Sequence, residues 1–320
     1  MNLKKNKKFI IVVCALSILF TVACEAASKM MDSALDNKLV KDQVGGETVN
    51  NLKAGKEIGG NLAEAAKAAI SSMPLEDERV LGETVGVQLY ATQGFGEPVK
   101  NQDLMLFLNT MANVIAQNSA RPNIPYHVAV VTSDEKNAYA LPGGYIFLTS
   151  GLVLSLQNEA QLAVVIGHEI AHIAKKHTLN EMQKSKSLGS LVDAGGGALK
   201  ASSFGSDSQM GVFTDFIKDL GKKIAAHSFS KELEIEADME GVRYAYDTGY
   251  DPKAILGVLD ILQAKDADVS GDHATTSDRR AAFQQKLQNE FAEEGMSGLV
   301  TTTGRMQQVK QWIQSGNAGW

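Results

Sequence analysis

Cysteine is scarce in this sequence. Among its 320 residues only Cys14 and Cys24 are cysteines, and we expect Cys14 to be removed with an N-terminal leader. The mature chain would then keep a single thiol, whereas a disulfide needs two. An internal disulfide and catalysis by thiol chemistry are therefore excluded.

The chain also lacks an excess of positive charge and a long apolar run. Its 31 Lys and Arg residues face 37 Asp and Glu residues, and the formal net charge is -6. Nucleic acids and anionic membrane surfaces, which attract basic proteins, are therefore not expected as partners. Beyond the leader no run reaches the roughly 18 apolar residues that indicate a membrane-spanning helix. With 44% hydrophobic residues the chain can nevertheless bury a globular core.

The N-terminus has the pattern of a bacterial signal peptide. Four lysines within the first eight residues precede an apolar run at 9–23, which is shorter than the roughly 20 residues of a spanning helix. Residues 20–24, FTVAC, resemble a lipobox, in which small residues precede a cysteine that is acylated, although Thr21 stands where leucine is usual. We therefore expect residues 1–23 to be a lipoprotein signal peptide and Cys24 to become the lipidated mature N-terminus.

An alternative is ordinary cleavage near Ala26, which would release a soluble periplasmic protein. In both cases the protein is exported to the periplasmic side of a bacterial membrane. Glu25, which follows the cysteine in place of aspartate, favours the outer membrane by analogy with lipoprotein sorting. The lipid anchor would be the only contact with the membrane.

Composition divides the remaining chain into segments. These are a polar tether with an Ala-rich helix at 24–72, a catalytic domain at 73–290 with a Gly- and Ser-rich insertion at 185–230 that we expect to be mobile, and a C-terminal helical tail at 291–320. Apolar periodicity predicts helices at 103–118, 158–177 and 230–247, and β-branched runs predict strands at 127–131 and 144–149. The expected fold class is α+β and predominantly helical.

The strongest motif is HEIAH at residues 168–172, which matches the pattern HExxH. On a helix, residues four apart lie about 40° from eclipsed, so the imidazoles of His168 and His172 face one ion. Glu169 lies beside the same face, where its carboxylate can take a proton from a metal-bound water. The pattern therefore predicts a catalytic zinc site.

A catalytic zinc normally has three protein ligands and one open position, so a third ligand is needed. On one continuous helix, His177 would lie about 900° from His168 and would point to the opposite side. A downstream carboxylate remains, and the helix that begins at Ser230 offers several. Geometry alone does not choose among them: Glu232, Glu234 and Glu236. Asp238 lies four residues after Glu234, on the same helix face, and could accept a hydrogen bond from a ligand histidine.

Several segments together resemble a known family. They are HEIAH at 168–172, SKELEIEAD at 230–238, GYDP at 249–252, NAYALPGG at 137–144 and TSGL at 149–152. The chain resembles, over roughly residues 75–290, the HtpX and CAAX-prenyl-protease superfamily of zinc metallopeptidases, metallopeptidase family forty-eight, and within it the soluble periplasmic lipoprotein branch. Lys231 stands where the family often has arginine.

The resemblance implies a zincin-like fold with a small β-sheet beside the HExxH helix, and it assigns roles. One Zn2+ per chain would be held by His168, His172 and Glu234, with Glu169 as general base and Asp238 as the carboxylate that orients a ligand. His273 and Arg279 match a family histidine followed six residues later by arginine, although the family's prolines after the histidine are missing. By resemblance these two would approach the open side of the zinc and stabilise the oxyanion or occlude the resting site.

The expected function is that of a zinc metalloendopeptidase that cleaves unfolded or misfolded cell-envelope proteins, including outer-membrane proteins. The segment Asn137, Ala138, Tyr139 and Ala140 and the strand that follows would pair with an extended substrate through backbone hydrogen bonds. The alternative is a chaperone-like or latent lipoprotein assembly factor that keeps the zinc fold but cleaves little. Glu169 argues against a pure pseudoenzyme.

The role that the resemblance gives to His273 can be tested by the variant His273→Ala. We expect changed peptidase activity with full zinc content, because the residue would contact the reacting groups without holding the metal. Metal analysis of the purified variant, beside an activity assay, measures both. Loss of bound zinc would contradict the role.

Overall fold

A computed structural model describes residues 73–91, 95–183, 207–225, 229–262, 275–290 and 298–316. The expected signal peptide, the lipidated Cys24, the tether at 24–72, His273 and most of the insertion at 185–230 lie outside these residues. The chain forms two compact units. The first comprises residues 1–72 and 183–216, of which the structure describes residue 183 and residues 207–216. The second comprises residues 73–182 and 217–320 and is described below.

The sheet of the second unit has three strands in the order β1-β3-β2. These are β1 (His127–Val131), β2 (Ala138–Leu141) and β3 (Tyr145–Thr149). The central strand β3 pairs in parallel with β1 and antiparallel with β2, so that Ile146 lies between Val128 and Ala140. Glycines with positive φ, Gly143 and Gly144, form the tight turn from β2 to β3. Both predicted strands are present, and β2 forms an edge of the sheet.

Helices make up most of the described chain. They are α4 (Leu75–Tyr90), α5 (Gln102–Ala116), α6 (Ser150–Ser155), α7 (Glu159–Ala174), α8 (His177–Gln183), α10 (Asp207–Ala225), α11 (Lys231–Asp247), α12 (Ala254–Leu262), α13 (Thr276–Glu290) and α14 (Thr303–Ser315). The expected α+β, predominantly helical fold with a small sheet is therefore confirmed. No helix of the described ranges is long and apolar enough to cross a membrane.

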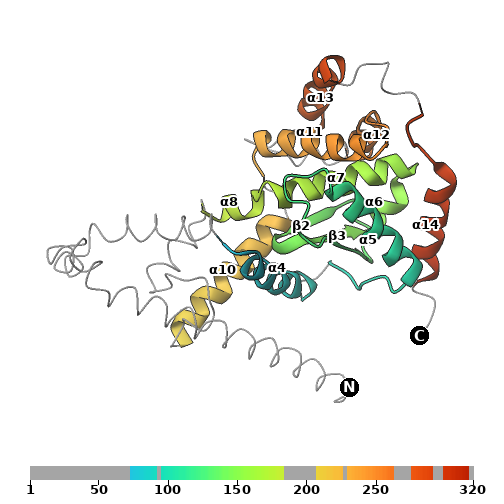
Figure 1. The fold of residues 1–320 in the computed structure, drawn as a ribbon. Coiled ribbons are helices and arrows are strands. Elements are labelled where there is room, and N and C mark those ends of the chain that lie inside the picture. The colour runs from blue at the N-terminus through green and yellow to red at the C-terminus, as the bar shows by residue number, and fades with distance from the viewer. Residues whose placement is uncertain are drawn as a thin grey trace. The chain divides into compact units, whose positions relative to one another are not determined.

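Helix α7, which carries HEIAH, is the central element of the second unit. Every residue from Glu159 to Ala174 is buried. Helices α11 and α12 lie on one side of α7 and the sheet on the other (Figure 1). The helix begins as its sequence indicates, because the side chain of Asn158 accepts a hydrogen bond from the backbone N–H of Gln161. The motif is thus held in the interior.

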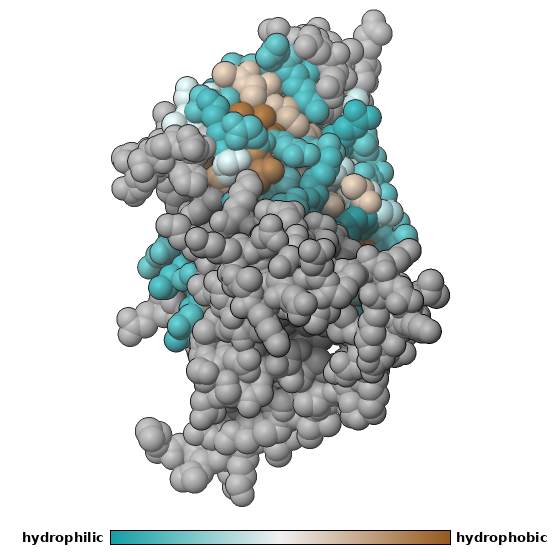
Figure 2. Space-filling model, turned by 90° about the vertical axis from the view of Figure 1, so that its left-hand side faces the viewer, coloured by the Kyte–Doolittle hydropathy of each residue, from teal (hydrophilic) through white to brown (hydrophobic). Residues whose placement is uncertain are grey.

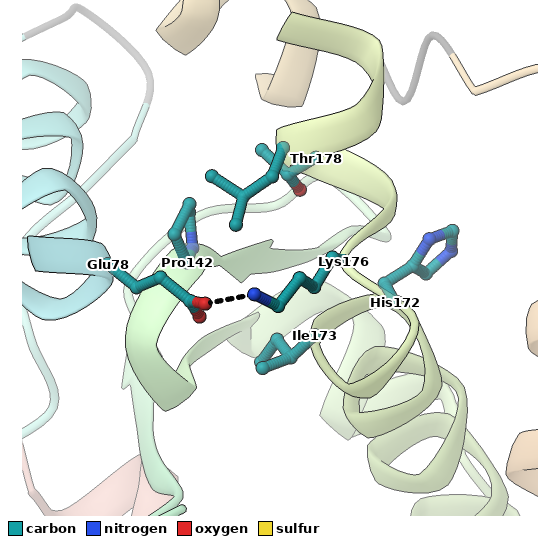
Figure 3. A pocket seen from close by; sticks show the side chains of 7 residues that line it. Glu78, Pro142, His172, Ile173, Lys176 and Thr178 are labelled. Atoms are coloured by element: carbon teal, nitrogen blue, oxygen red, sulfur yellow. Dashed lines mark ion pairs between the residues drawn. The ribbon is translucent and has the colours of Figure 1, made fainter. Parts of the chain in front are cut away.

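The predicted end of this helix at His177 is wrong. Helix α7 ends at Ala174, Lys176 adopts a left-handed conformation with φ 57°, and α8 begins at His177. The turn is fixed by the buried carboxylate of Glu78, which forms ion pairs with Lys176 (2.9 Å) and Arg121 (2.8 Å). Figure 3 shows the first of these pairs in a small pocket beside the end of α7, with the His172 ring directed away from it. A contact distant in sequence therefore decides this boundary.

Two glycines let α7 and α11 cross with their backbones in contact. A Cβ atom added at Gly167 would lie 2.4 Å from the carbonyl oxygen of Gly241, and one added at Gly241 would lie 2.4 Å from the backbone nitrogen of His168. Both distances are far below van der Waals contact, and backbone atoms cannot rotate away as a side chain can. Only glycine fits at either position of this crossing.

The C-terminal segment belongs to the second unit together with α7. Helix α14 buries Met306, Val309 and Ile313 in the same hydrophobic core as α7. The buried carboxylate of Glu159, the first residue of α7, accepts hydrogen bonds from the hydroxyl of Thr302 and from Arg305. Residues beyond 290, which we expected as a tail, thus stabilise the start of the HEIAH helix.

The visible described surface is mainly hydrophilic, with small hydrophobic patches (Figure 2). The exposed large hydrophobic side chains of the described residues are Val87, Tyr90, Leu106, Val114 and Val300. Four of these five lie on α4 and α5, away from the HEIAH motif in sequence.

Replacing Gly241 by alanine should destabilise the protein by about 1–3 kcal/mol, because the methyl group overpacks a backbone-to-backbone contact. It should also weaken metal binding, because α11 must move away from α7. Gly304→Ala is the matched control: a Cβ at this helical glycine meets no described heavy atom within 4 Å, so stability should stay equal or rise slightly. Urea unfolding of both variants measures the difference, and equal free energies of unfolding would contradict the prediction.

Candidate metal centre

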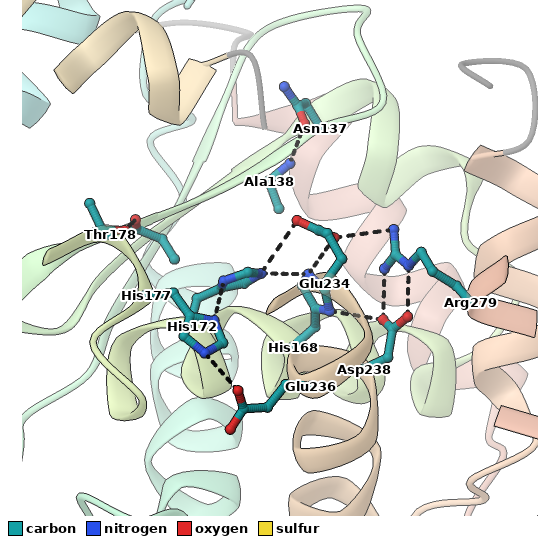
Figure 4. Close-up of polar contacts among 11 residues, drawn as sticks. Asn137, Ala138, His168, His172, His177, Thr178, Glu234, Glu236, Asp238 and Arg279 are labelled. Atoms are coloured by element: carbon teal, nitrogen blue, oxygen red, sulfur yellow. Dashed lines mark hydrogen bonds and ion pairs between the residues drawn. The ribbon is translucent and has the colours of Figure 1, made fainter. Parts of the chain in front are cut away.

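Three side chains from two helices converge on one point inside the second unit (Figure 4). His168 and His172 of α7 direct their Nε2 atoms at each other, 3.0 Å apart. Glu234 of α11 places its Oε2 atom 3.7 Å from Nε2 of His168 and its Oε1 atom 3.8 Å from Nε2 of His172. The potential ligand atoms of all three residues lie within 4.8 Å of one another.

Helix spacing left three carboxylates of α11 as candidates for the third metal ligand, and the structure distinguishes among them. Glu234 is buried and faces the two histidines. Glu232 is exposed, and Glu236 lies near Lys175 and His177 instead, at 3.3 and 3.5 Å. Among the described residues, Glu234 is therefore the carboxylate that completes a three-ligand group.

The chemistry of these groups fits a divalent cation. The Oε1 atom of Glu234 is buried and has no hydrogen-bond partner in the described part of the chain, which is costly for a carboxylate. The two Nε2 atoms are too close for both to carry a proton, so at least one lone pair faces the other nitrogen. A bound cation would satisfy the unpaired oxygen and the nitrogen lone pairs together.

Asp238 of α11 orients His168 through the ring nitrogen Nδ1, which points away from the other candidate ligands. The Nδ1 atom of His168 lies 2.9 Å from Oδ1 of Asp238 and donates to it, which leaves Nε2 free to accept. Arg279 of α13 donates to both oxygens of Asp238, at 2.6 and 2.7 Å, and approaches Oε2 of Glu234 at 3.5 Å. Burial acts to raise the pKa of Asp238, but Arg279 and His168 hold that pKa below its usual range. Asp238 is thus a buried, charged acceptor.

Arg279 contacts the two carboxylates of α11, Asp238 and Glu234. The approach to the open side of the zinc that the resemblance implies for its guanidinium stays a prediction. The residue directly before Arg279 is also bonded to α11, since the Asp278 carboxylate accepts a hydrogen bond from Lys231 at 2.8 Å. Helix α13 therefore supports α11 near the candidate ligands.

Two residues that sequence analysis set aside or missed hold His172. His177, which we had excluded as lying on the opposite side, places its Nδ1 atom 2.9 Å from Nδ1 of His172. Phe229 stacks on the His172 ring, with centroids 4.3 Å apart and planes 22° from parallel. The turn at Lys176 brings His177 into place, and that turn has no glycine or proline to signal it in the sequence.

Glu169 is buried next to the candidate ligands and is 3% exposed. Within the described chain its carboxylate has no hydrogen-bond partner, so it is available to a water molecule or substrate. Burial raises the pKa of Glu169 to about 7, with a further contribution from Glu234 and opposing ones from His168 and Arg279. A pKa near neutrality suits a group that both accepts and donates a proton.

The segment Asn137 to Ala140 leads into the edge strand β2. The backbone N–H of Thr149 donates to the Asn137 carbonyl, and hydrogen-bonded pairs alternate along antiparallel strands, so the backbone groups of Ala138 and Ala140 face away from β3. Two of these outward groups are already bonded. The Ala138 N–H donates to Oδ1 of Asn137 (3.1 Å), and the Ala140 carbonyl accepts from the Thr178 hydroxyl (3.3 Å).

Comparison with known proteins gives a consistent result. Residues 100–312 match Peptidase family M48. The chain is 26% identical over 202 residues to the Beta-barrel assembly-enhancing proteases of Yersinia pestis and Escherichia coli, which covers 63% of this chain and 40% of each relative. It is also 29% identical over 161 residues to the Mitochondrial metalloendopeptidase OMA1 of Arabidopsis thaliana, covering 50% of this chain and 30% of that protein. With the Metalloprotease LoiP of Escherichia coli it shares 26% identity over 195 residues, 58% of this chain and 72% of that protein.

Replacing Arg279 by leucine should cost about 3–5 kcal/mol of stability, because it leaves Asp238 as an unpaired buried charge. The adjacent Arg280, paired with the exposed Asp260, is the matched control, and Arg280→Leu should cost no more than about 1 kcal/mol. Adding Asp238→Asn to Arg279→Leu should recover part of the loss, since one of the two buried carboxylates that Arg279 contacts is then uncharged. Chemical denaturation measures all three, and equal losses for the two arginines would contradict the expectation.

Proposed function

This chain belongs to peptidase family M48, and we propose that it is a zinc-dependent metalloendopeptidase. One observation carries the proposal: His168, His172 and Glu234 converge beside Glu169, a buried carboxylate with no partner among the described residues. Two imidazoles and one carboxylate are a ligand set of catalytic zinc sites that leaves one position open. A zinc ion bound there would polarise the scissile carbonyl and lower the pKa of a water molecule.

Glu169 is the general base in this proposal. Its carboxylate takes a proton from the attacking water and later gives it to the nitrogen of the leaving amine. The raised pKa of about 7 supports both transfers, because neither form of the carboxyl is strongly favoured near neutral pH. Hydrolysis then proceeds without a covalent bond between this chain and its substrate.

The remaining polar residues act on the ligands or on the substrate. Asp238 orients His168, and Arg279 holds Asp238 and Glu234 in place as a positioning residue. This positioning role follows from the contacts of its guanidinium with the carboxylates, and the oxyanion contact expected for Arg279 stays a proposal beside it. His273 remains the proposed group for the oxyanion or for occlusion of the resting site.

Substrate would bind as an additional strand on the edge of β2. Helix α7 packs against β2, so a peptide on this edge runs close to the candidate metal ligands. The outward Ala138 carbonyl and Ala140 N–H can form the paired backbone hydrogen bonds of an antiparallel strand. Backbone hydrogen bonds depend little on which side chains the substrate carries. This mode of binding therefore suits unfolded or misfolded polypeptides of varied sequence.

The biological setting is proposed from the leader and from the relatives. The chain spans 40% of the length of the two Beta-barrel assembly-enhancing proteases, and their name refers to the assembly of β-barrels. We propose misfolded envelope proteins, outer-membrane proteins among them, as substrates. Lipidation at Cys24 would place the enzyme on the periplasmic side of the outer membrane.

A second function, that of a latent peptidase or chaperone-like assembly factor, is favoured by one observation. Two of the outward backbone groups of β2 are occupied by side chains of the same chain, namely Asn137 and Thr178. A substrate strand must share or displace these bonds before it can pair fully with the edge. Such a resting state would bind polypeptide weakly and cleave it slowly until the edge is released.

The variant Glu169→Gln separates these functions. Wild type and variant should each bind one zinc ion per chain, whereas cleavage of unfolded casein should fall by roughly 100- to 10,000-fold in the variant through loss of the general base. Glu232→Gln, at an exposed glutamate of α11, is the matched control and should cleave normally. A chelator should abolish wild-type cleavage, and added zinc should restore it.

Zinc binding without cleavage by the wild type would favour the latent or chaperone-like function. Absence of zinc from the wild-type protein would contradict the proposed metal centre. Full cleavage by Glu169→Gln would contradict the role of that residue as general base.

A further inference from the structure

A chain of polar contacts leads from His172 to the surface of α11. The Nδ1 atom of His172 lies 2.9 Å from Nδ1 of His177. The other ring nitrogen of His177, Nε2, lies 3.5 Å from Oε2 of Glu236. Glu236 is half-exposed and also pairs with Lys175 at 3.3 Å. Figure 4 shows His177 and Glu236 following His172 in this chain of contacts, on the side of His172 opposite Glu234.

The positions of the hydrogens follow from the donors and acceptors in this chain. If Nε2 of His172 presents a lone pair to a metal, the ring hydrogen must be on Nδ1. That hydrogen faces Nδ1 of His177, which then accepts it and carries its own hydrogen on Nε2. The nearest carboxylate to this second N–H is that of Glu236. One pattern of tautomers therefore directs each ring hydrogen from the candidate ligand toward Glu236. The last step is a 3.5 Å contact and not a hydrogen bond, since Nε2 of His177 has no hydrogen-bond partner among the described residues.

We propose that His177 is a positioning residue for the metal ligand His172, and that Glu236 anchors His177. The inference rests on the proposed zinc function and extends it to residues that do not touch the metal. His177 selects the ring orientation and the tautomer that direct Nε2 of His172 toward Glu234. For His168 the ring orientation and tautomer are fixed directly by the hydrogen bond to Asp238. The two ligand histidines are therefore oriented by different partners, a carboxylate for His168 and a second histidine for His172.

Packing alone cannot supply this selection. Phe229 stacks on His172 and fixes the plane of the ring. A half-turn about the Cβ–Cγ bond returns an imidazole to the same plane but exchanges Nε2 with a carbon atom. Stacking therefore permits both orientations, whereas the contact with His177 requires a nitrogen at one position. The hydrogen bond, not the aromatic contact, decides which atom faces the metal.

The local backbone places His177 where a continuous helix would not. Nine residues after His168 on one helix, it would point to the opposite side. The left-handed Lys176, paired with the buried Glu78, breaks the helix and directs His177 back toward His172. The next residue, Thr178, contacts the edge strand. The first turn of α8 therefore contacts a candidate metal ligand and the proposed substrate edge in succession.

The test is the zinc affinity of the full-length protein, measured by competition with a chromophoric chelator. His177→Leu should weaken zinc binding by roughly 10- to 100-fold, the usual effect of losing a partner of a metal ligand. His177→Asn keeps an acceptor near the position of Nδ1 and should recover most of this loss. His127→Leu, at an exposed histidine of β1, is the matched control and should bind zinc as the wild type does.

A second pair of variants avoids the buried position. Glu236→Gln should weaken zinc binding less than His177→Leu and should add no further loss in the His177→Leu background, because both act through one chain of contacts. Glu240→Gln is its control: Glu240 also pairs with Lys175, at 2.9 Å, but it is not in contact with His177. Thermal unfolding of the metal-free proteins separates a loss of zinc affinity from a loss of folding.

The outcomes distinguish this inference from the function on which it rests. Wild-type zinc affinity in a folded His177→Leu protein, or equal affinity in the leucine and asparagine variants, would overturn the role of His177 and leave the zinc centre intact. An effect of Glu240→Gln as large as that of Glu236→Gln would overturn the anchor. Failure of the wild-type protein to bind zinc would overturn the zinc centre and this inference together.

Discussion

The backbone contact of α7 and α11 at Gly167 and Gly241 is the constraint on which the site depends. Gly167 directly precedes the first histidine of HEIAH, so the crossing point lies beside that histidine. Glu234 precedes Gly241 by seven residues, which is nearly two full turns, and therefore projects from the same face of α11. With a larger residue at the crossing, the helices would separate and the carboxylate would withdraw from both histidines. The register between α7 and α11 and the distance between their axes are thus set by two glycines, Gly167 and Gly241.

The close crossing has an energetic consequence for its surroundings. It places several ionisable side chains in the interior: His168, Glu169, His172, Glu234 and Asp238. Burial of charge is unfavourable unless the charges are paired. Arg279 provides the pairing from α13 by contacting the two carboxylates of α11. Helix α13 is therefore needed to neutralise the carboxylates that the crossing of α7 and α11 buries.

Much of this architecture could be predicted from the sequence because the signals are local. The HEIAH pattern, the Asn158 cap and the β-branched run at 127–131 each lie within a few residues and determine their elements. The choice among Glu232, Glu234 and Glu236 could not be made from residue spacing, since it depends on the face that α11 turns toward α7. The break after α7 was missed because its cause, the buried carboxylate of Glu78, is distant in sequence. The position of His177 was missed for the same reason.

The start of α7 links the candidate site to the last part of the polypeptide. The Glu159 carboxylate is buried and is bonded by Tyr250, Thr302 and Arg305, while its backbone N–H donates to the Thr302 carbonyl. A nascent chain released only as far as α13 would contain every proposed metal ligand, yet would lack two of the three side chains that neutralise and bond this carboxylate. The start of the HEIAH helix is therefore fully anchored only when residues 298–316 are present and folded against it. The anchoring of this helix thus depends on residues that lie 143 and 146 positions away in the sequence.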